Sequence, residues 1–494
     1  MVCGAITIKE SRLVSVARNQ TRASSREIAI NGRSLRIAFY YIYIACLIGV
    51  NASLFVSRVS IGELASNQLF TASWIALHGA AMIVFLSLIG RQDSRNFTFV
   101  CALGAFILAS AAWSVAPSVT LIYGGMLAGN ILVAHLMASE LSFSEIIRLV
   151  ARVILVLSLV AVIAYYLKFS TVYYYDAHQR PNILGSQPFR GFTAHKILMG
   201  LYVTVGLASV LATMRGAARA FWIIILGLCV ALTGSMIGIV IFAITPLLFF
   251  LIKKCALSGI RPWNMLLTGG ALAAISAYFV YANWQNLLAL LERDSTLTGR
   301  TTLWNLGVDA WLQRPLLGWG FGAYLQSANS DLTNRAFNRY GTWDIPHFHQ
   351  SFIQTAVDLG AVGVVILVGI LFYVLAASYK YALNTDAATG SFAFVTIAVL
   401  IMSGMVMFAY FNYNHLGTFL VMLLFFALRR ESAISDRGPI VGATERVAMP
   451  ADSQRLLDVR RRPARRSFSN LVEPRYPGYR LIPSGNAAKA KRAF

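Results

Sequence analysis

The stretch RVILVLSLVAVIAYYL, from Arg152 to Leu167, is an almost unbroken apolar run. At a rise of about 1.5 Å per residue, a helix of roughly 20 residues crosses the hydrocarbon core of a bilayer. Similar runs recur throughout the 494 residues, of which 57% are hydrophobic and 13% charged. Soluble domains carry about a quarter charged residues. The composition therefore predicts an all-α, polytopic integral membrane protein.

We predict about twelve transmembrane helices from the apolar runs. They lie near residues 37–56, 70–90, 97–113, 118–137, 152–167, 196–213, 220–233, 236–252, 264–283, 359–378, 391–410 and 413–429. The runs at 220–233 and 236–252 are short and separated by three residues, so a single re-entrant pair is the alternative there.

The net charge of +22 is distributed unevenly and predicts an orientation. Basic residues precede the first span and recur in alternate short loops: Lys9, Arg12, Arg18, Arg22, Arg26, Arg33, Arg36, Arg91, Arg95, Arg148, Arg152, Arg215, Arg219, Lys253, Lys254, Arg261, Lys380, Arg429 and Arg430. By the positive-inside rule these segments are cytoplasmic. Both termini are then inside, and the loops at 57–69, 168–195, 284–358 and 411–415 face outward.

Three parts follow from this pattern. Residues 1–34 are a basic cytoplasmic segment without a cleavable signal peptide, because a full-length span follows the basic head. Residues 35–430 form the transmembrane domain, with the large outward loop at 284–358. Residues 431–494 form a basic, proline-containing tail that we predict to be disordered; it either docks on lipid headgroups or a partner, or is a solvated extension that sets topology.

The composition also excludes some functions. The basic residues follow no nucleic-acid recognition pattern and lie at cytoplasmic membrane edges, where anionic headgroups attract them. The five cysteines include no pair in an outward loop, so no disulfide framework or zinc site is predicted.

The large outward loop carries a predicted surface helix. The segment 301–312 has helical spacing, with Trp304, Val308, Trp311 and Leu312 on one side. We expect Thr298 to cap it and Pro315 to end it.

Arg300 lies in the first turn of that helix. The first turn of a helix has free backbone N–H groups and carries the positive end of the helix dipole. Together with the Arg300 guanidinium, these groups favour binding of an anion such as a phosphate. A surface ion pair with Asp294 or Asp309 is the alternative.

A second outward loop places Arg190 and Gly191 just before His195 and Lys196. Arg190 is a candidate for a second phosphate contact, with His195 and Lys196 in support. Lys196 can equally reach the membrane interface with its long side chain.

His347 and His349 end the large loop, directly before the chain re-enters the membrane. A histidine there can exchange a proton near neutral pH, since its ordinary pKa is about 6.5. The pair also has the spacing of two metal ligands, but no carboxylate or thiol cluster accompanies it, so we predict no metal site and no cofactor.

Taken in order, the motifs resemble a known family. They are AWSVAPS (112–118), FRGFTAHK (189–196), LTGS (232–235), TGRTTLW (298–304), RPLLGWGFGAY (314–324) and HFHQSFIQTAVDLG (347–360). Over most of residues 97–378 this order is similar to that of O-antigen ligases and bacterial surface-polysaccharide polymerases. Their fold resembles the membrane-embedded GT-C-type glycosyltransferases.

The resemblance implies a glycosyltransferase of the bacterial inner membrane with its active site facing the periplasm. It implies a donor glycan on undecaprenyl pyrophosphate, held by Arg190 and Arg300, and an acceptor hydroxyl activated by His349. Arg314 and His347 are then possible supports. The chain has Gln350 and Ile197 where the family usually has asparagine.

The sequence leaves three functions open. A polymerase would join repeat units of an exopolysaccharide or O-antigen, acting with a chain-length regulator. A ligase would transfer the finished glycan to lipid A core. The third is a polysaccharide-related transporter or lipid flippase, against which stands the lack of Asp, Glu, Lys or Arg near the centre of any span.

Overall fold

The computed structural model of the protein describes residues 32–55, 67–91, 93–175, 181–283, 300–326 and 347–436. These residues are helical apart from connecting segments and one isolated antiparallel bridge between Tyr173 and Phe189. The chain forms two units, Met1–Arg437 and Gly438–Phe494, and the second lies outside the described residues. The assignment of 431–494 as a separate tail stays a prediction.

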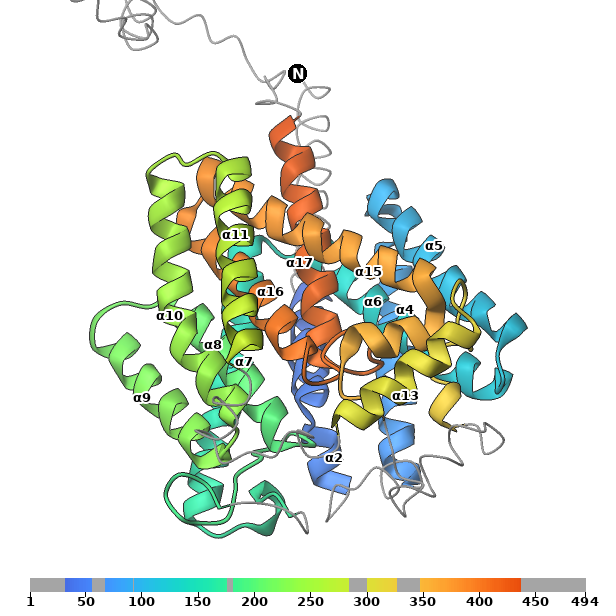
Figure 1. The fold of residues 1–494 in the computed structure, drawn as a ribbon, viewed down its shortest axis with the longest axis horizontal. Helices are drawn as coiled ribbons and strands as arrows, with labels where there is room; N and C mark the ends of the chain where they lie inside the picture. Colours follow the sequence, from blue (N-terminus) through green and yellow to red (C-terminus); the bar gives the residue numbers. More distant parts are fainter. Residues whose placement is uncertain are drawn as a thin grey trace, which may run out of the picture. The chain divides into compact units, whose positions relative to one another are not determined.

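A helix over residues 32–48 begins the described chain. It is followed by α2 (Val50–Phe55), α4 (Gln68–Leu88), η1 (Ile89–Arg91), α5 (Ser94–Ala109), η2 (Ser110–Trp113), α6 (Pro117–Glu140), α7 (Phe143–Tyr166), η3 (Ser170–Val172), α8 (Lys196–Thr213), α9 (Gly216–Thr233), α10 (Met236–Leu257), α11 (Pro262–Ala282), α13 (Arg300–Gln313), η4 (Tyr324–Gln326), α15 (Ser351–Asn384), α16 (Ala387–Gly404) and α17 (Leu416–Asp436) (Figure 1).

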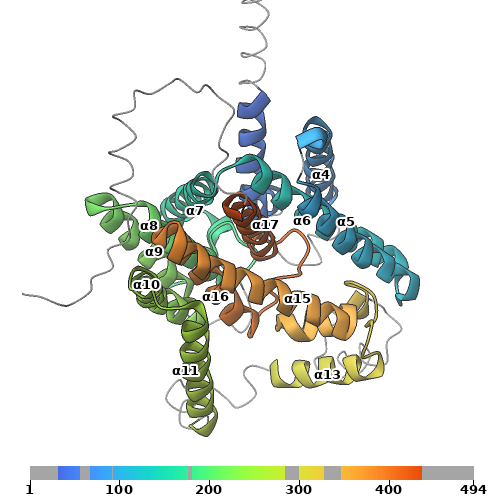
Figure 2. The ribbon, with the colours of Figure 1, turned by 90° about the horizontal axis from the view of Figure 1, so that it is seen from above.

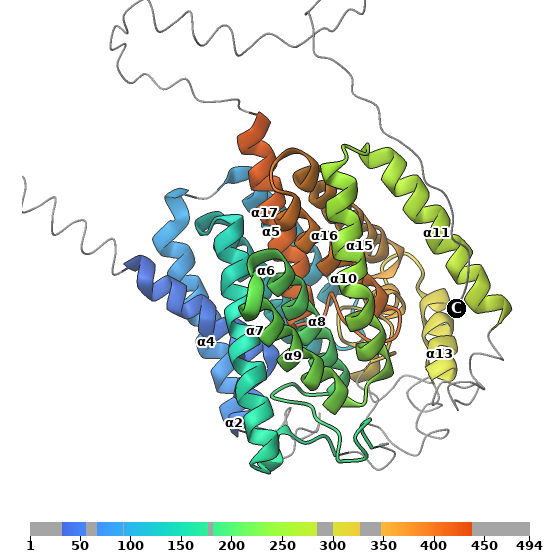
Figure 3. The ribbon, with the colours of Figure 1, turned by 90° about the vertical axis from the view of Figure 1, so that its left-hand side faces the viewer.

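Among the described residues, nine helices are long and apolar enough to cross a membrane: α4, α5 with η2, α6, α7, α8, α9, α10, α15 and α16. The prediction of an all-α, polytopic membrane protein is confirmed. The other three predicted spans fall on the helix at 32–48, on α11 and on α17, so the count of twelve stays a prediction. Figure 3 shows α9 and α10 as two separate helices. Gly234, between them, has a left-handed backbone conformation.

Helix α17 lies at the centre of the bundle, against α6, α15 and α16 (Figure 2). Every residue from Leu416 to Leu428 is buried. A helix that is apolar on all sides belongs in such a position. Lipid offers the same apolar surroundings as a protein interior, so close packing between side chains holds the helices together.

The segment 405–415 corrects one predicted boundary. We predicted a span over 391–410, but α16 ends at Gly404 and the chain continues as an irregular segment. Phe411 and Asn414 have positive φ angles of 53° and 48°. The segment is apolar because it packs inside the protein, and hydropathy alone does not distinguish such a segment from a span.

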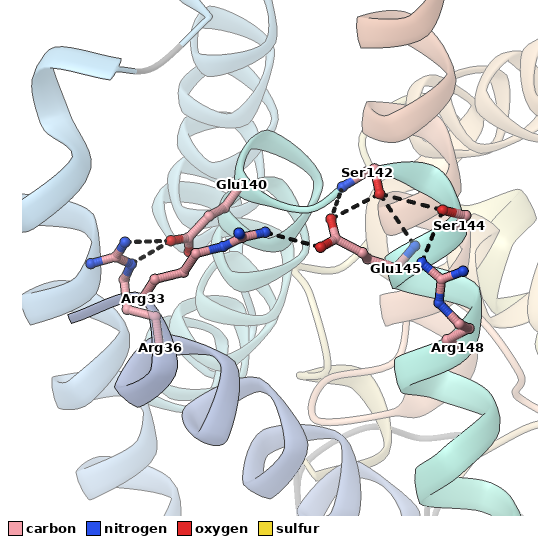
Figure 4. A network of polar contacts seen from close by, with 7 residues as sticks. All are labelled: Arg33, Arg36, Glu140, Ser142, Ser144, Glu145 and Arg148. Atoms are coloured by element: carbon pink, nitrogen blue, oxygen red, sulfur yellow. Dashed lines mark hydrogen bonds and ion pairs between the residues drawn. The ribbon is translucent and has the colours of Figure 1, made fainter. Parts of the chain in front are cut away.

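Polar contacts tie predicted cytoplasmic segments together (Figure 4). Arg36 pairs with Glu140 at the end of α6, and Arg33 pairs with Glu145 at the start of α7. The Ser142 hydroxyl and the Glu145 carboxylate form a reciprocal cap at the start of α7. These contacts join the helix at 32–48 to the connection between α6 and α7.

Helix α15 breaks at Gly360, next to the start of the span predicted at residue 359. The φ and ψ angles there are 66° and −165°, a combination open in practice to glycine alone. The break leaves backbone N–H and carbonyl groups without partners inside the helix. Segment 314–324, here called the glycine loop, forms hydrogen bonds with them. Trp319 and Gly320 donate N–H groups to the carbonyls of 357 and 358 at 2.8 and 3.0 Å, and Ala361 and Val362 donate to those of 315 and 316 at 2.8 and 3.3 Å.

Gly360→Ala is expected to destabilise the protein by about 3 kcal/mol or more. A Cβ at this position would run into the Leu316 carbonyl, and the backbone conformation is itself unfavourable for alanine. Thermal unfolding of the detergent-solubilised protein measures the effect.

Gly369→Ala is the matched control in the same helix. A Cβ there meets no atom within 4 Å, and alanine favours a helix interior by roughly 1 kcal/mol over glycine. An unfolding temperature for Gly360→Ala equal to that of the control would contradict the proposed role of the break.

Candidate active site

Helix α13 begins at Arg300, as the sequence predicted for a residue of the first turn. The helix ends at Gln313, just before the predicted terminator Pro315. The predicted cap, Thr298, lies outside the described residues, as does Asp294. The described ion pairs do not include one between Arg300 and Asp309.

The buried side of α13 faces the start of α15 (Figures 1 and 2). Gly307 and Ala310 are its buried residues, whereas Val308 and Leu312 are exposed. A Cβ on Gly307 would meet Ile353 and the ring of Phe348, so only glycine lets the two segments approach this closely. The predicted helix is confirmed, with Val308 and Leu312 on a side that is not packed against the protein.

Gln350 caps α15 and directs the preceding segment. Its Oε1 accepts the Ile353 N–H at 2.6 Å, which satisfies one of the free donors of the first turn. His349, directly before it, has a φ of 54°, a left-handed conformation that is uncommon for residues other than glycine.

Two buried residues of α15, Gln354 and Asp358, hold the same segment through hydrogen bonds. Gln354 accepts the Phe348 N–H on Oε1 at 3.1 Å and donates from Nε2 to both carboxylate oxygens of Asp358, at 3.2 and 3.1 Å. Both side chains are almost fully buried. The backbone between His347 and His349 is therefore fixed by packing and hydrogen bonds together.

The structure brings four histidines and one arginine together. His347 interacts electrostatically with His349, His195, His415 and Arg300, and we call these five residues the histidine cluster. The rings of His347 and His349 lie 4.2 Å apart, edge to face. The cluster joins three loops that the sequence predicted to face outward, at 168–195, 284–358 and 411–415.

Three of these histidines use Nδ1 in the same way. Nδ1 accepts the backbone N–H two residues later, at 3.2 Å for His195, 3.1 Å for His347 and 3.0 Å for His415. Since a neutral imidazole has one donor and one acceptor nitrogen, the hydrogen of each ring is on Nε2. In His415 this nitrogen lies 3.3 Å from the Tyr202 hydroxyl, so that histidine is held within the protein.

Three histidines of the cluster, His347, His349 and His415, have pKa values lowered by burial and are neutral at pH 7. Burial lowers the pKa of His349 to about 4, with a further contribution from the Arg300 guanidinium. Burial lowers the pKa of His347 well below its ordinary value, and the neighbouring histidines and Arg300 act in the same direction. His349 is thus an unprotonated imidazole beside a fixed positive charge.

Arg190 is positioned differently from Arg300. The side chain is almost fully buried, and burial lowers its pKa to about 10. Nε donates to the Tyr173 carbonyl at 3.0 Å and Nη1 to the Thr193 carbonyl at 2.8 Å. The Thr193 hydroxyl lies 2.7 and 2.9 Å from the carbonyl oxygens of Arg190 and His195. Arg190 therefore braces the loop that presents His195.

Tyr174 joins the two residues that follow this loop. Its ring lies 4.6 Å from the ring of His195, edge to face, and 5.5 Å from the Lys196 ammonium. The Ile197 N–H donates to His195, so this position contributes its backbone and no asparagine side chain is needed for that contact.

Arg314 supports the glycine loop. Nη1 donates to the Trp113 carbonyl at 3.0 Å, and the guanidinium lies 4.2 Å from the centre of the Trp319 ring. No described contact links Arg314 to the histidine cluster. Arg314 thus joins motif 112–118 to motif 314–324.

His415 was not among the candidates from sequence. Like His349, His415 lies in a predicted outward loop directly before a span. This shared position could have identified it as a candidate site residue. Within the described ranges, no three His, Cys, Asp or Glu side chains are arranged to hold a metal ion. Metal-independent chemistry stays a prediction.

Comparison with known proteins adds two matches. The sequence model described as O-antigen ligase matches residues 221–368, from α9 into α15. Over 367 residues the chain is 25% identical to the exopolysaccharide production protein ExoQ of Rhizobium meliloti (strain 1021), covering 70% of this chain and 79% of that protein. The matched residues include Arg300, His347 and His349. The chain is therefore a polytopic membrane protein whose residues 221–368 match the O-antigen ligase family model, and it is distantly similar to ExoQ.

Proposed function

We propose that the protein is an inner-membrane glycosyltransferase that polymerises repeat units of an exopolysaccharide or O-antigen. The donor is a glycan on undecaprenyl pyrophosphate, and the acceptor is a sugar hydroxyl. The observation that carries the proposal is the neutral His349 beside Arg300 at the start of α13. This arrangement pairs a proton acceptor with a fixed anion-binding group.

The proposed reaction gives His349 and Arg300 separate tasks at the anomeric carbon of the donor sugar. The bond between the anomeric carbon and the pyrophosphate oxygen breaks, and a bond to the acceptor oxygen forms. The acceptor's proton passes to His349. Negative charge develops on the leaving pyrophosphate, where the Arg300 guanidinium and the first turn of α13 stabilise it.

Two observations bear on the acceptor. The name of ExoQ, exopolysaccharide production protein, favours polymerisation, and the match covers most of both chains. The description of the family model, O-antigen ligase, favours transfer to lipid A core. The two functions share their chemistry and differ in the molecule that supplies the hydroxyl.

Purified protein in phospholipid vesicles tests the proposal. With lipid-linked repeat units as the only glycan, a polymerase yields a ladder of lengthening products and releases undecaprenyl pyrophosphate. If consumption begins only when lipid A core is added, the protein is a ligase. If no glycan bond forms and the lipid-linked donor changes leaflet, both transferase proposals are wrong.

The proposed orientation predicts the result of reporter fusions. Fusions after Ser330 should be active as periplasmic reporters, and fusions after Arg437 as cytoplasmic ones, because the basic segments remain inside. A cytoplasmic result at Ser330 would place the histidine cluster on the side opposite to its proposed donor.

A further inference from the structure

We propose that His347 is a hydrogen-bond donor to the pyrophosphate of the donor substrate, through Nε2–H. The inference rests on the proposed function and assigns a task to a residue that the sequence placed only in support. It follows from the way the HFHQ segment is folded.

The first observation is the hydrogen bond inside the segment. His347 Nδ1 accepts the His349 N–H at 3.1 Å, and this contact commits one of the two ring nitrogens. Nδ1 therefore carries no hydrogen in the neutral ring, and Nε2 must carry it. The hydrogen bond from the His349 N–H to Nδ1 therefore makes Nε2–H of His347 a hydrogen-bond donor. Nε2 cannot accept a proton in this form of the ring.

The second observation is the surroundings of that donor. No described residue accepts a hydrogen bond from His347 Nε2, and this atom is not among the fully buried polar atoms without a partner. His347 has the other four members of the histidine cluster around it, including Arg300. A donor that is left available next to a guanidinium points to an anionic ligand with several oxygen acceptors.

The third observation is the rigidity of the segment. Phe348, between the two histidines, is almost fully buried, and its N–H is held by Gln354, which is held in turn by Asp358. The direction of the donor is thus set before a ligand binds. Preorganised donors of this kind stabilise a leaving anion without having to reorient.

Two substitutions separate the proposed role from a merely structural one. His347→Asn keeps an acceptor for the N–H two residues later, as asparagine does in turns, but has no donor in the place of Nε2. His347→Gln extends an amide N–H toward the place of Nε2 and gives up the turn contact. If His347 only shapes the turn, His347→Asn should restore pyrophosphate binding. If His347 donates a hydrogen bond to pyrophosphate, His347→Gln should restore it instead.

The experiment measures binding of inorganic pyrophosphate to the purified full-length protein, independently of turnover. His347→Asn and His347→Ala are expected to weaken binding by about tenfold or more, as for loss of one hydrogen bond to a charged acceptor. His347→Gln should recover most of the affinity. Arg314→Lys serves as a control that leaves pyrophosphate binding close to that of the wild type, because Arg314 contacts the Trp113 carbonyl and the Trp319 ring and not the histidine cluster.

Wild-type affinity in His347→Asn, or equal losses in His347→Asn and His347→Gln, would overturn the assignment. Failure of the wild-type protein to bind pyrophosphate would overturn it as well. A wild-type protein that binds pyrophosphate with this pattern of variants, but forms no glycan bond, would reject the proposed function and not the donor role of His347.

Discussion

Arg300→Lys is expected to reduce polymer synthesis by about 10²-fold or more while the protein stays folded and inserted. Lysine keeps the positive charge at the start of α13 but loses the planar fork that matches two phosphate oxygens. The residue is at the first position of the helix, so the change should leave the packing of Gly307 and Ala310 on α15 intact. Polymer yield per amount of folded protein is the measurement.

Arg314→Lys is the control for this prediction. Arg314 also belongs to the region after α13, but it contacts the Trp113 carbonyl and the Trp319 ring and not the histidine cluster. It should retain activity within about threefold, in keeping with a peripheral packing contact. Near-normal synthesis by both Arg300→Lys and Arg190→Lys would show that the proposed phosphate contacts are wrong.

Arg190→Lys is the less direct test of the two arginines. Two of the nitrogens of Arg190 hold the carbonyls of Tyr173 and Thr193, so lysine would loosen the loop before His195. We expect reduced stability together with reduced activity in this variant, since buried carbonyl groups lose their donors. Arg300→Lys therefore tests the phosphate contact more directly than Arg190→Lys does.

His349→Asn is expected to lower turnover by about 10²- to 10⁴-fold, the usual contribution of a general base. Asparagine is preferable to alanine here, because it tolerates the positive φ of this position and leaves the turn unstrained. Turnover with EDTA present separates this role from a metal site at the two histidines. Loss of wild-type activity in EDTA would support a metal instead.

The acid limit of activity follows from the same residue. The sequence alone implied loss of activity near pH 6.5, the ordinary pKa of histidine. Burial and Arg300 lower the pKa of His349 to about 4, so the neutral, proton-accepting form persists to lower pH, and kcat/KM should fall only as pH approaches about 4. Bound pyrophosphate offsets the charge of Arg300, so the acid limit of kcat should lie at a higher pH than that of kcat/KM.

The sequence predicted the helices of this protein well and the details of their ends less well. Apolar length is a local property, so α7 or α10 can be recognised from their own residues. The segment 405–415 is also apolar, yet it turns inside the protein, and its neighbours in space are what bury it. The break of α15 at Gly360 likewise depends on the glycine loop more than 35 residues earlier.

The site was predictable to the extent that its residues lie in recognisable motifs. Arg300, His195, His347 and His349 were candidates, and the structure brings them together. The hydrogen bonds of Arg190 were not predictable, because they depend on carbonyl groups that only the folded loop presents. The same is true of the ring hydrogen of His347, which is set by one backbone contact.

The central claim is that Arg300 and His349 act at one site with separate tasks, one on the leaving pyrophosphate and one on the acceptor. A single-turnover experiment tests it most directly, with purified protein in vesicles, EDTA, and an undecaprenyl-pyrophosphate glycan whose binding and cleavage are followed separately. The account predicts that His349→Asn binds this donor nearly as well as the wild type but does not release undecaprenyl pyrophosphate, whereas Arg300→Lys binds it more weakly. Release by His349→Asn at the wild-type rate would contradict the account.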